Sequence, residues 1–264
     1  MTRARLDAEL VRRGLARSRE QAAELVAAGR VAVAGNPAAK PATQVEKDAP
    51  ITVTSSDDPG YVSRGGHKLA GALAAFAHLD VTGRWCLDAG ASTGGFTDVL
   101  LRAGAAHVVA VDVGYGQLAW SLRTDSRVTV LDRVNVRELK PVQVDPAPDL
   151  VVADLSFISL TLVLPALVAC ATPAADFVLM VKPQFEVGKG RVGAGGVVRD
   201  TTDRCDGIRK VCTAASQLGL GVRGITASPL PGPAGNVEYF VWLRFGAPPL
   251  DEADLQRAIE EGPA

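Results

Sequence analysis

Beyond residue 60, short apolar runs alternate along the chain with stretches of helical periodicity. The runs, each of a length typical of a buried strand, are 85–87, 108–111, 128–131, 150–153, 177–181, 222–225 and 237–245. Between most of them apolar residues recur three and four positions apart, as at Phe96, Val99 and Leu100. Strand and helix in regular alternation predict an α/β fold with a seven-stranded, mostly parallel sheet covered by helices on both faces.

The first 53 residues follow a different pattern. Apolar residues at helical spacing predict two short helices, about Arg5–Arg13 and Ser18–Ala28, with Ser18 as the N-cap of the second. Two alternating apolar segments, 31–33 and 51–53, then predict a small hairpin or sheet. The polar, Pro- and Gly-containing segment 55–60 separates the two patterns and is the best candidate for a domain boundary.

One apolar stretch could be mistaken for a membrane span. From Leu155 to Ala175 the chain has 21 residues without a charge, which is long enough to cross a bilayer. However, Pro165 and Pro173 interrupt it, and it links two strands of the same predicted sheet. We therefore expect a loop and a buried helix inside the α/β core.

The amino-acid composition is that of a globular protein in a reducing compartment. The chain has 264 residues, of which 47% are hydrophobic and 22% charged, as in an ordinary globular protein. Its four cysteines form no Cys-x-x-Cys pair and no cluster with histidine, so we expect neither a disulfide framework nor a metal site. The N-terminus lacks the apolar core of a signal peptide, and we expect a cytoplasmic protein. The net charge is −1, yet residues 1–47 hold nine Arg and Lys against five Asp and Glu, so attraction to nucleic acid would be local.

Candidate cofactor-binding residues follow the first strands of the sheet, where open α/β sheets bind ligands. Asp88-Ala-Gly-Ala-Ser-Thr-Gly-Gly does not have the spacing of a dinucleotide-binding loop, and its leading acid would repel a phosphate. Asp112, at the end of the next strand, could accept both hydroxyls of a ribose. A nucleoside with an amine and no phosphate fits both acids, which points to S-adenosylmethionine. Asn135 could contact the adenine or only cap a turn. The predicted cofactor residues are Asp88, Gly90, Ser92, Thr93, Gly94, Gly95, Phe96, Asp112 and Asn135.

Four charged residues could meet at the same edge of the sheet. Asp154 and Lys182 follow the fourth and fifth strands, and Glu238 begins the last, which brings it to this edge if that strand is antiparallel. Lys68 lies on the helix before the first strand. A lysine can take the proton of a sugar hydroxyl or stabilise the alkoxide as it forms. We expect Lys182 in that role, held by Asp154 and Glu238, with Lys68 as a second positive group; ordinary surface ion pairs are the alternative.

Several segments of the chain together resemble the TlyA family of ribosomal RNA 2′-O-methyltransferases, some of whose members are called haemolysins. The segments are Arg5-Leu-Asp, Ser63-Arg-Gly-Gly-His-Lys-Leu, Asp88-Ala-Gly-Ala-Ser-Thr-Gly-Gly-Phe-Thr, Asp154-Leu-Ser-Phe-Ile-Ser and Lys182-Pro-Gln-Phe-Glu. The resemblance implies an S4-like RNA-binding domain over residues 1–58, a linker over 59–63, and an FtsJ-like, Rossmann-like class I methyltransferase domain over 64–264. It also implies a catalytic tetrad of Lys68, Asp154, Lys182 and Glu238.

The resemblance implies ribosomal RNA in ribosomal subunits as the partner, with cytidines of 16S or 23S RNA as targets. We expect RNA contacts at Arg3, Arg5, Arg17, Arg19 and Arg64, and a monomer that requires no membrane. Two alternatives are a membrane-lytic haemolysin and a non-catalytic RNA-binding factor for ribosome assembly. The sequence shows no cationic amphipathic helix of the membrane-binding kind, which disfavours the haemolysin. A non-catalytic factor would have no use for the four residues of the tetrad, which disfavours the second alternative.

Overall fold

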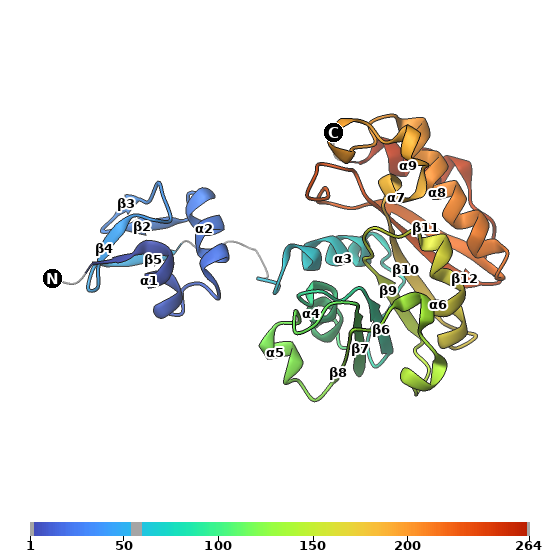
Figure 1. Ribbon diagram of the computed structural model, residues 1–264, viewed down its shortest axis with the longest axis horizontal. Helices are drawn as coiled ribbons and strands as arrows, with labels where there is room; N and C mark the ends of the chain where they lie inside the picture. The colour runs from blue at the N-terminus through green and yellow to red at the C-terminus, as the bar shows by residue number, and fades with distance from the viewer. Residues whose placement is uncertain (1–2, 54–59, 263–264) are drawn as a thin grey trace. The chain divides into compact units, whose positions relative to one another are not determined.

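The computed structural model describes residues 3–53 and 60–262. The chain forms two compact units, Met1–Gly60 and Tyr61–Ala264 (Figure 1). Most of the polar segment 55–60, which we expected at the domain boundary, lies outside the described residues. The predicted limits of the domains and linker stay predictions.

The first unit contains the two helices and the small sheet that the sequence predicted, together with a second small sheet, Arg3–Arg5 with Gln44–Glu46, that it did not predict. Its helices are α1 (Leu6–Arg12) and α2 (Arg19–Ala27), and its strands are β1 (Arg3–Arg5), β2 (Val31–Val33), β3 (Asn36–Pro37), β4 (Gln44–Glu46) and β5 (Ile51–Val53). Strand β1 pairs with β4, and β2 pairs with β3 and β5, all antiparallel. Ser18 Oγ accepts a hydrogen bond from the backbone N–H of Gln21, which confirms the expected N-cap of α2.

The second unit is built on a seven-stranded sheet in the order β11-β12-β10-β9-β6-β7-β8. The strands are β6 (Trp85–Ala89), β7 (His107–Asp112), β8 (Val128–Asp132), β9 (Leu150–Ala153), β10 (Asp176–Val181), β11 (Leu220–Ala227) and β12 (Tyr239–Phe245). All seven predicted runs form strands, and β12 is antiparallel to both of its neighbours. It begins at Tyr239, two residues later than predicted, which leaves Glu238 just before the strand.

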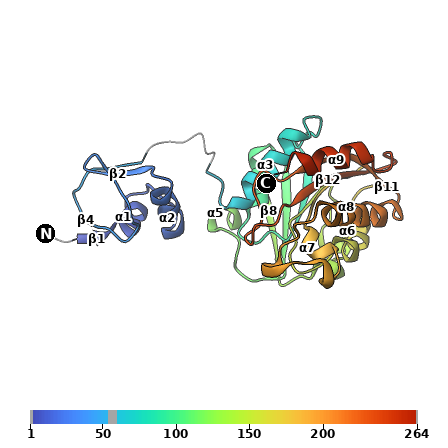
Figure 2. The same ribbon diagram turned by 90° about the horizontal axis from the view of Figure 1, so that it is seen from above.

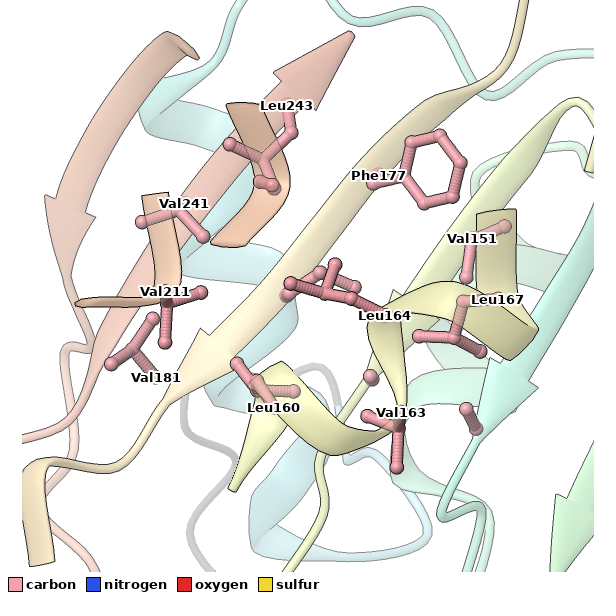
Figure 3. Packing of buried hydrophobic residues seen from close by; sticks show 14 of the residues in the cluster. Val151, Leu160, Val163, Leu164, Leu167, Phe177, Val181, Val211, Val241 and Leu243 are labelled. Carbon is pink, nitrogen blue, oxygen red and sulfur yellow. The ribbon is translucent and has the colours of Figure 1, made fainter. Parts of the chain in front are cut away.

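Helices cover both faces of this sheet, as expected (Figure 2). They are α3 (Arg64–Ala75), α4 (Gly95–Arg102), α5 (Trp120–Arg123), α6 (Leu164–Cys170), α7 (Pro183–Glu186), α8 (Thr201–Ser216) and α9 (Glu252–Glu260). Residues of α3, α4 and α5 pack on one face, and residues of α6 and α8 pack on the other. Figure 3 shows the second of these cores, where Leu164 and Leu167 of α6 lie beside Phe177 of β10.

The uncharged stretch 155–175 is part of this core. It contains a 3₁₀ turn, Leu160–Leu162, and then helix α6, whose Leu164 and Leu167 are fully buried against the sheet. Within residues 3–53 and 60–262, none of the helices has the length and apolar character needed to cross a membrane.

Candidate active site

The alternation of side chains along the strands gathers the predicted site on one face of the sheet. The strand residues that pack toward α3 and α4 are even-numbered, and they include Cys86, Ala110, Val152, Met180 and Phe240. Successive side chains of a strand point to opposite faces, so residues two positions away share a face. The residues in that position are Asp88, Asp112, Asp154, Lys182 and Glu238. Parity therefore brings acids and a lysine from five neighbouring strands to the face that α3, with Lys68, covers.

Lys182 is held by groups from the end of the neighbouring strand β9. Its ammonium lies 2.6 Å from Asp154 Oδ1 and donates a hydrogen bond of 2.9 Å to Ser156 Oγ. Lys182 follows β10 directly, and its side chain is almost entirely buried. A lysine in this setting can be desolvated without losing its charge partner. The pairing of Lys182 with Asp154 agrees with the expectation from sequence.

Glu238 pairs with Lys68 rather than with Lys182, which corrects part of the expected arrangement. Val181 is paired with Tyr239 between β10 and β12, so positions 182 and 238 adjoin across the ladder. The carboxylate nevertheless accepts a 2.5 Å hydrogen bond from Lys68 Nζ, because α3 places that lysine over the same sheet face. Both side chains are buried, and Glu238 Oε1 has no hydrogen-bond partner among the described residues. A buried carboxylate oxygen without a partner can accept a hydrogen bond from a ligand.

Asp88 lies inside β6 and is fully buried. Its Oδ2 accepts a 2.7 Å hydrogen bond from Thr97 Oγ1 of α4, while its Oδ1 has no partner within the described residues. Burial, more than the nearby acids, raises the pKa of Asp88 to about 7. A buried carboxylate of this kind favours a cationic ligand, which would restore its ordinary acidity.

Two glycines shape the loop after β6. Gly90 has φ = 89°, and a Cβ there would lie 2.5 Å from the backbone oxygen of Asp154. Gly94 has φ = 97°, and a Cβ there would lie 2.3 Å from Leu122. Other residues would be strained at both positions, so the loop needs glycine to pass close to its neighbours.

Asp112 ends β7 beside this loop. Its two carboxylate oxygens accept hydrogen bonds from the backbone N–H groups of Ser92, at 2.8 Å, and Gly114, at 2.7 Å. These bonds fix the carboxylate and leave lone pairs for two hydroxyl donors, as a ribose would supply. Asp88 thus fits a positively charged group of S-adenosylmethionine, Asp112 fits its ribose hydroxyls, and the glycine loop lies between them.

The comparisons with known proteins give the family. Residues 61–245 match the model of FtsJ-like methyltransferases, and residues 4–51 match the S4 domain model. The chain is 62% identical over 267 residues to the 16S/23S rRNA (cytidine-2′-O)-methyltransferase TlyA of Mycobacterium tuberculosis, covering 99% of each chain. The chain belongs to the TlyA family. The chain combines an S4 domain with an FtsJ-like domain, and it is accordingly an S-adenosylmethionine-dependent methyltransferase.

Two further relatives carry the name haemolysin. The chain is 37% identical to Hemolysin A of Brachyspira hyodysenteriae, covering 89% of this chain and 97% of that protein. It also resembles a solved structure from Streptococcus thermophilus described as a hemolysin, with a TM-score of 0.76 and 38% identity over 99% of this chain and 97% of that one. The TlyA family therefore spans proteins named for two different activities.

The remaining cofactor candidates of this TlyA-family chain are Asn135, Phe96, Thr93 and Gly95. Asn135 Oδ1 accepts a hydrogen bond from the backbone N–H of Arg137, so its side chain caps a turn, as one of our two interpretations had it. Phe96 is buried in the core, and its ring lies 5.9 Å from that of Phe240. The backbone oxygen of Thr93 accepts a hydrogen bond from Ala119, and Gly95 begins α4 beside Ser63.

The arginines predicted to contact RNA divide between the two units. Arg5 and Arg19 both donate hydrogen bonds to the buried carboxylate of Asp7, and Arg3 lies 3.9 Å from Glu46. Arg17 contacts Gln21 in the same unit. Arg64 is an exposed residue at the start of α3, in the second unit.

Sequence reasoning missed two residues that hold site side chains in place. Thr97 anchors Asp88, and Ser156 contacts Lys182. Ser156 lies two positions after Asp154 in a segment already singled out, and strand parity could have identified it. Thr97 could not be found in this way, because its contact with Asp88 depends on how α4 packs against β6. No group of three or more potential metal ligands occurs among residues 3–53 and 60–262.

Proposed function

We propose that this chain transfers a methyl group from S-adenosylmethionine to the 2′ hydroxyl of cytidines in 16S and 23S ribosomal RNA. The observation that carries the proposal is the pair of contacts between a buried lysine and a carboxylate, Lys182–Asp154 and Lys68–Glu238, on the sheet face that also holds Asp88 and Asp112. The choice of RNA and nucleotide rests on the TlyA relative from Mycobacterium tuberculosis, whose name states both.

The cofactor residues act through charge and fit. Asp88, through its unpartnered Oδ1, would hold the amino group of the cofactor's methionine part, and Asp112 would hold the ribose. Gly90 and Gly94 would hold the loop between Asp88 and α4 in the shape that receives the cofactor, because a Cβ at either position would meet Asp154 or Leu122. When bound, S-adenosylmethionine supplies a methyl group made electrophilic by the sulfonium. No metal ion is needed for such a transfer.

Lys182 would act on the substrate hydroxyl. A ribose 2′ hydroxyl is a poor nucleophile until its proton is removed. Lys182 first loses a proton to solvent; as an amine it then takes the proton of the hydroxyl, and Asp154 at 2.6 Å stabilises the ammonium that forms again. Glu238 Oε1 accepts a hydrogen bond from the ribose, and the hydrogen bond from Lys68 Nζ to Oε2 orients that carboxylate. Holding the 2′ oxygen in line with the bond between the methyl group and the sulfur supplies much of the remaining acceleration.

The surface around this cluster suits an RNA. Phe157, the residue directly after Ser156, is 92% exposed, and its ring lies 5.4 Å from that of Phe185. A cavity of about 580 Å³ opens beside the two rings, and exposed aromatic faces can stack on unpaired bases. The arginines of the first unit would contact phosphates without reading sequence. We propose that the chain acts as a monomer on ribosomal subunits in the cytoplasm, without a membrane.

The test uses purified 30S and 50S subunits that lack the modification. They are incubated with the protein and cofactor carrying a labelled methyl group, and ribose methylation is then mapped along both RNAs. We expect 2′-O-methylated cytidine at defined positions in both subunits. An absence of label from both RNAs, with release of dye from liposomes at physiological salt, would favour the membrane-lytic alternative.

A further inference from the structure

The buried carboxylate of Glu186 has no part in the mechanism above. It lies at the end of α7, four residues after Lys182, and is 3% exposed. Its Oε2 accepts a 2.5 Å hydrogen bond from Ser159 Oγ, and its Oε1 accepts a 2.7 Å hydrogen bond from the backbone N–H of Leu160. Burial raises its pKa, which shows how unfavourable the site is for an isolated charge.

These hydrogen bonds connect the same two segments that meet at Lys182. One segment, residues 154–160, carries Asp154 and Ser156, and the other, residues 182–186, carries Lys182. Lys182 joins the segments at one end, and Glu186 joins them at the other. Between the two ends, Phe157 contacts Phe185.

The segment 154–160 needs such support because little regular structure holds it. It runs from the end of β9 to the 3₁₀ turn at Leu160, and Phe157 adopts φ = 64°, a conformation unfavourable for a bulky residue. Glu186 itself is anchored from outside, since Lys210 of α8 donates a 2.7 Å hydrogen bond to its backbone oxygen. The carboxylate thus ties an irregular segment to a fixed helix.

We infer that Glu186 is a positioning residue, which holds segment 154–160 so that Asp154 and Ser156 stay against the ammonium of Lys182. The inference rests on the proposed function, because it assigns Glu186 to the same methyl transfer. A buried carboxylate costs free energy that an apolar side chain would not. The carboxylate offsets this cost through its hydrogen bonds to Ser159 and Leu160, which fix the position of segment 154–160.

The test compares three variants in the methylation of ribosomal subunits. Glu186→Ala removes both hydrogen bonds, and we expect kcat to fall about 30-fold, since small misplacements of reacting groups are costly. The KM for S-adenosylmethionine should stay within about twofold, because the cofactor residues lie on other segments. Glu186→Gln should recover kcat to within about threefold of the unchanged protein, since its amide can accept from Leu160 and donate to Ser159.

Ser159→Ala removes the hydrogen bond to Glu186 Oε2 while the Glu186 side chain stays in place, and it also removes the two hydrogen bonds between Ser159 Oγ and Thr161; we expect a loss of about threefold in kcat. Glu252→Ala, at an exposed acid of α9, is the matched control and should leave kcat unchanged. If Glu186→Ala does not fold, the Ser159→Ala result decides. The inference is wrong if kcat is unchanged in Ser159→Ala and Glu186→Ala, or if Glu186→Gln is as slow as Glu186→Ala. Failure of the unchanged protein to methylate either subunit would instead overturn the proposed function.

Discussion

The two units bury acidic side chains to different effect. In the first unit, Asp7 and Glu9 are buried, but the arginines that contact them, such as Arg5 and Arg12, remain about half exposed. In the second unit, Lys68 and Glu238 are buried together. Asp7 and Glu9 of the first unit thus present cations to solvent, while Glu238 of the second holds a lysine that is buried with it.

This difference has a consequence for each unit. An exposed guanidinium acts on phosphates over the screening length of the solution, so its effect weakens with salt. A desolvated ammonium acts strongly, but only on a group that enters the site. We therefore expect the first unit to set affinity for RNA and the second to set the rate of transfer.

Lys182→Ala should separate rate from affinity most sharply. Removing the group that takes the 2′ proton should lower kcat about 1,000-fold, within the range for a general base. The measurement is single-turnover methylation of 30S and 50S subunits. Binding of S-adenosylmethionine by calorimetry should change little, and a residual rate above a tenth of the original would contradict the role of Lys182.

The double change Arg5→Ala and Arg19→Ala should lower affinity and leave kcat unchanged; because both arginines also hydrogen-bond to the buried Asp7, circular dichroism checks that the first unit stays folded. Loss of two phosphate contacts should weaken binding of the ribosomal RNA about 30-fold at low salt and flatten its salt dependence by about two ions. Filter binding at a series of salt concentrations measures both. Arg257→Ala, at an exposed arginine of α9, is the control. An unchanged salt dependence in the double variant would remove these arginines from the RNA surface.

Binding of S-adenosylmethionine should depend on the ionisation of Asp88. Its pKa is about 7, so the carboxyl is mostly protonated at pH 6 and mostly ionised at pH 8. Only the ionised form attracts a cation, so the Kd should fall about tenfold from pH 6 to pH 8. Calorimetry over this range tests it, with Asp88→Asn as the comparison. A pH dependence that persists in Asp88→Asn would assign the titration to another group.

The smallest expected effect concerns the stability of the first unit alone. Ser18→Ala removes the N-cap of α2 and should lower the free energy of unfolding by about 1 kcal/mol. Chemical denaturation followed by a probe placed in the first unit measures it. Ser126→Ala, at an exposed turn of the second unit, should have no effect. Equal losses from both changes would show that the cap does not stabilise the helix.

Much of this arrangement was predictable because it depends on local pattern. Apolar runs predicted every strand of the large sheet, and the carboxyl ends of those strands predicted where charged residues would gather. Strand parity could have gone further, since it puts Asp154, Lys182 and Glu238 on one face.

The partner of each lysine could not be predicted in this way. Lys68 and Glu238 are 170 residues apart in sequence, and their contact depends on the angle at which α3 crosses the sheet. The same holds for Thr97 and Asp88, which meet through the packing of α4. Glu186 was visible in the Lys-Pro-Gln-Phe-Glu segment, but its role depends on the path of an irregular segment, 154–160, which no periodicity describes.

The most direct test of the account identifies the atom that receives the methyl group. Ribosomal RNA from both subunits is methylated by the unchanged protein and by Lys182→Ala, digested to nucleosides and analysed by mass spectrometry. We expect 2′-O-methylcytidine from the unchanged protein and almost none from the variant. Cytidine methylated on its base, or the same yield of 2′-O-methylcytidine from both proteins, would contradict the account.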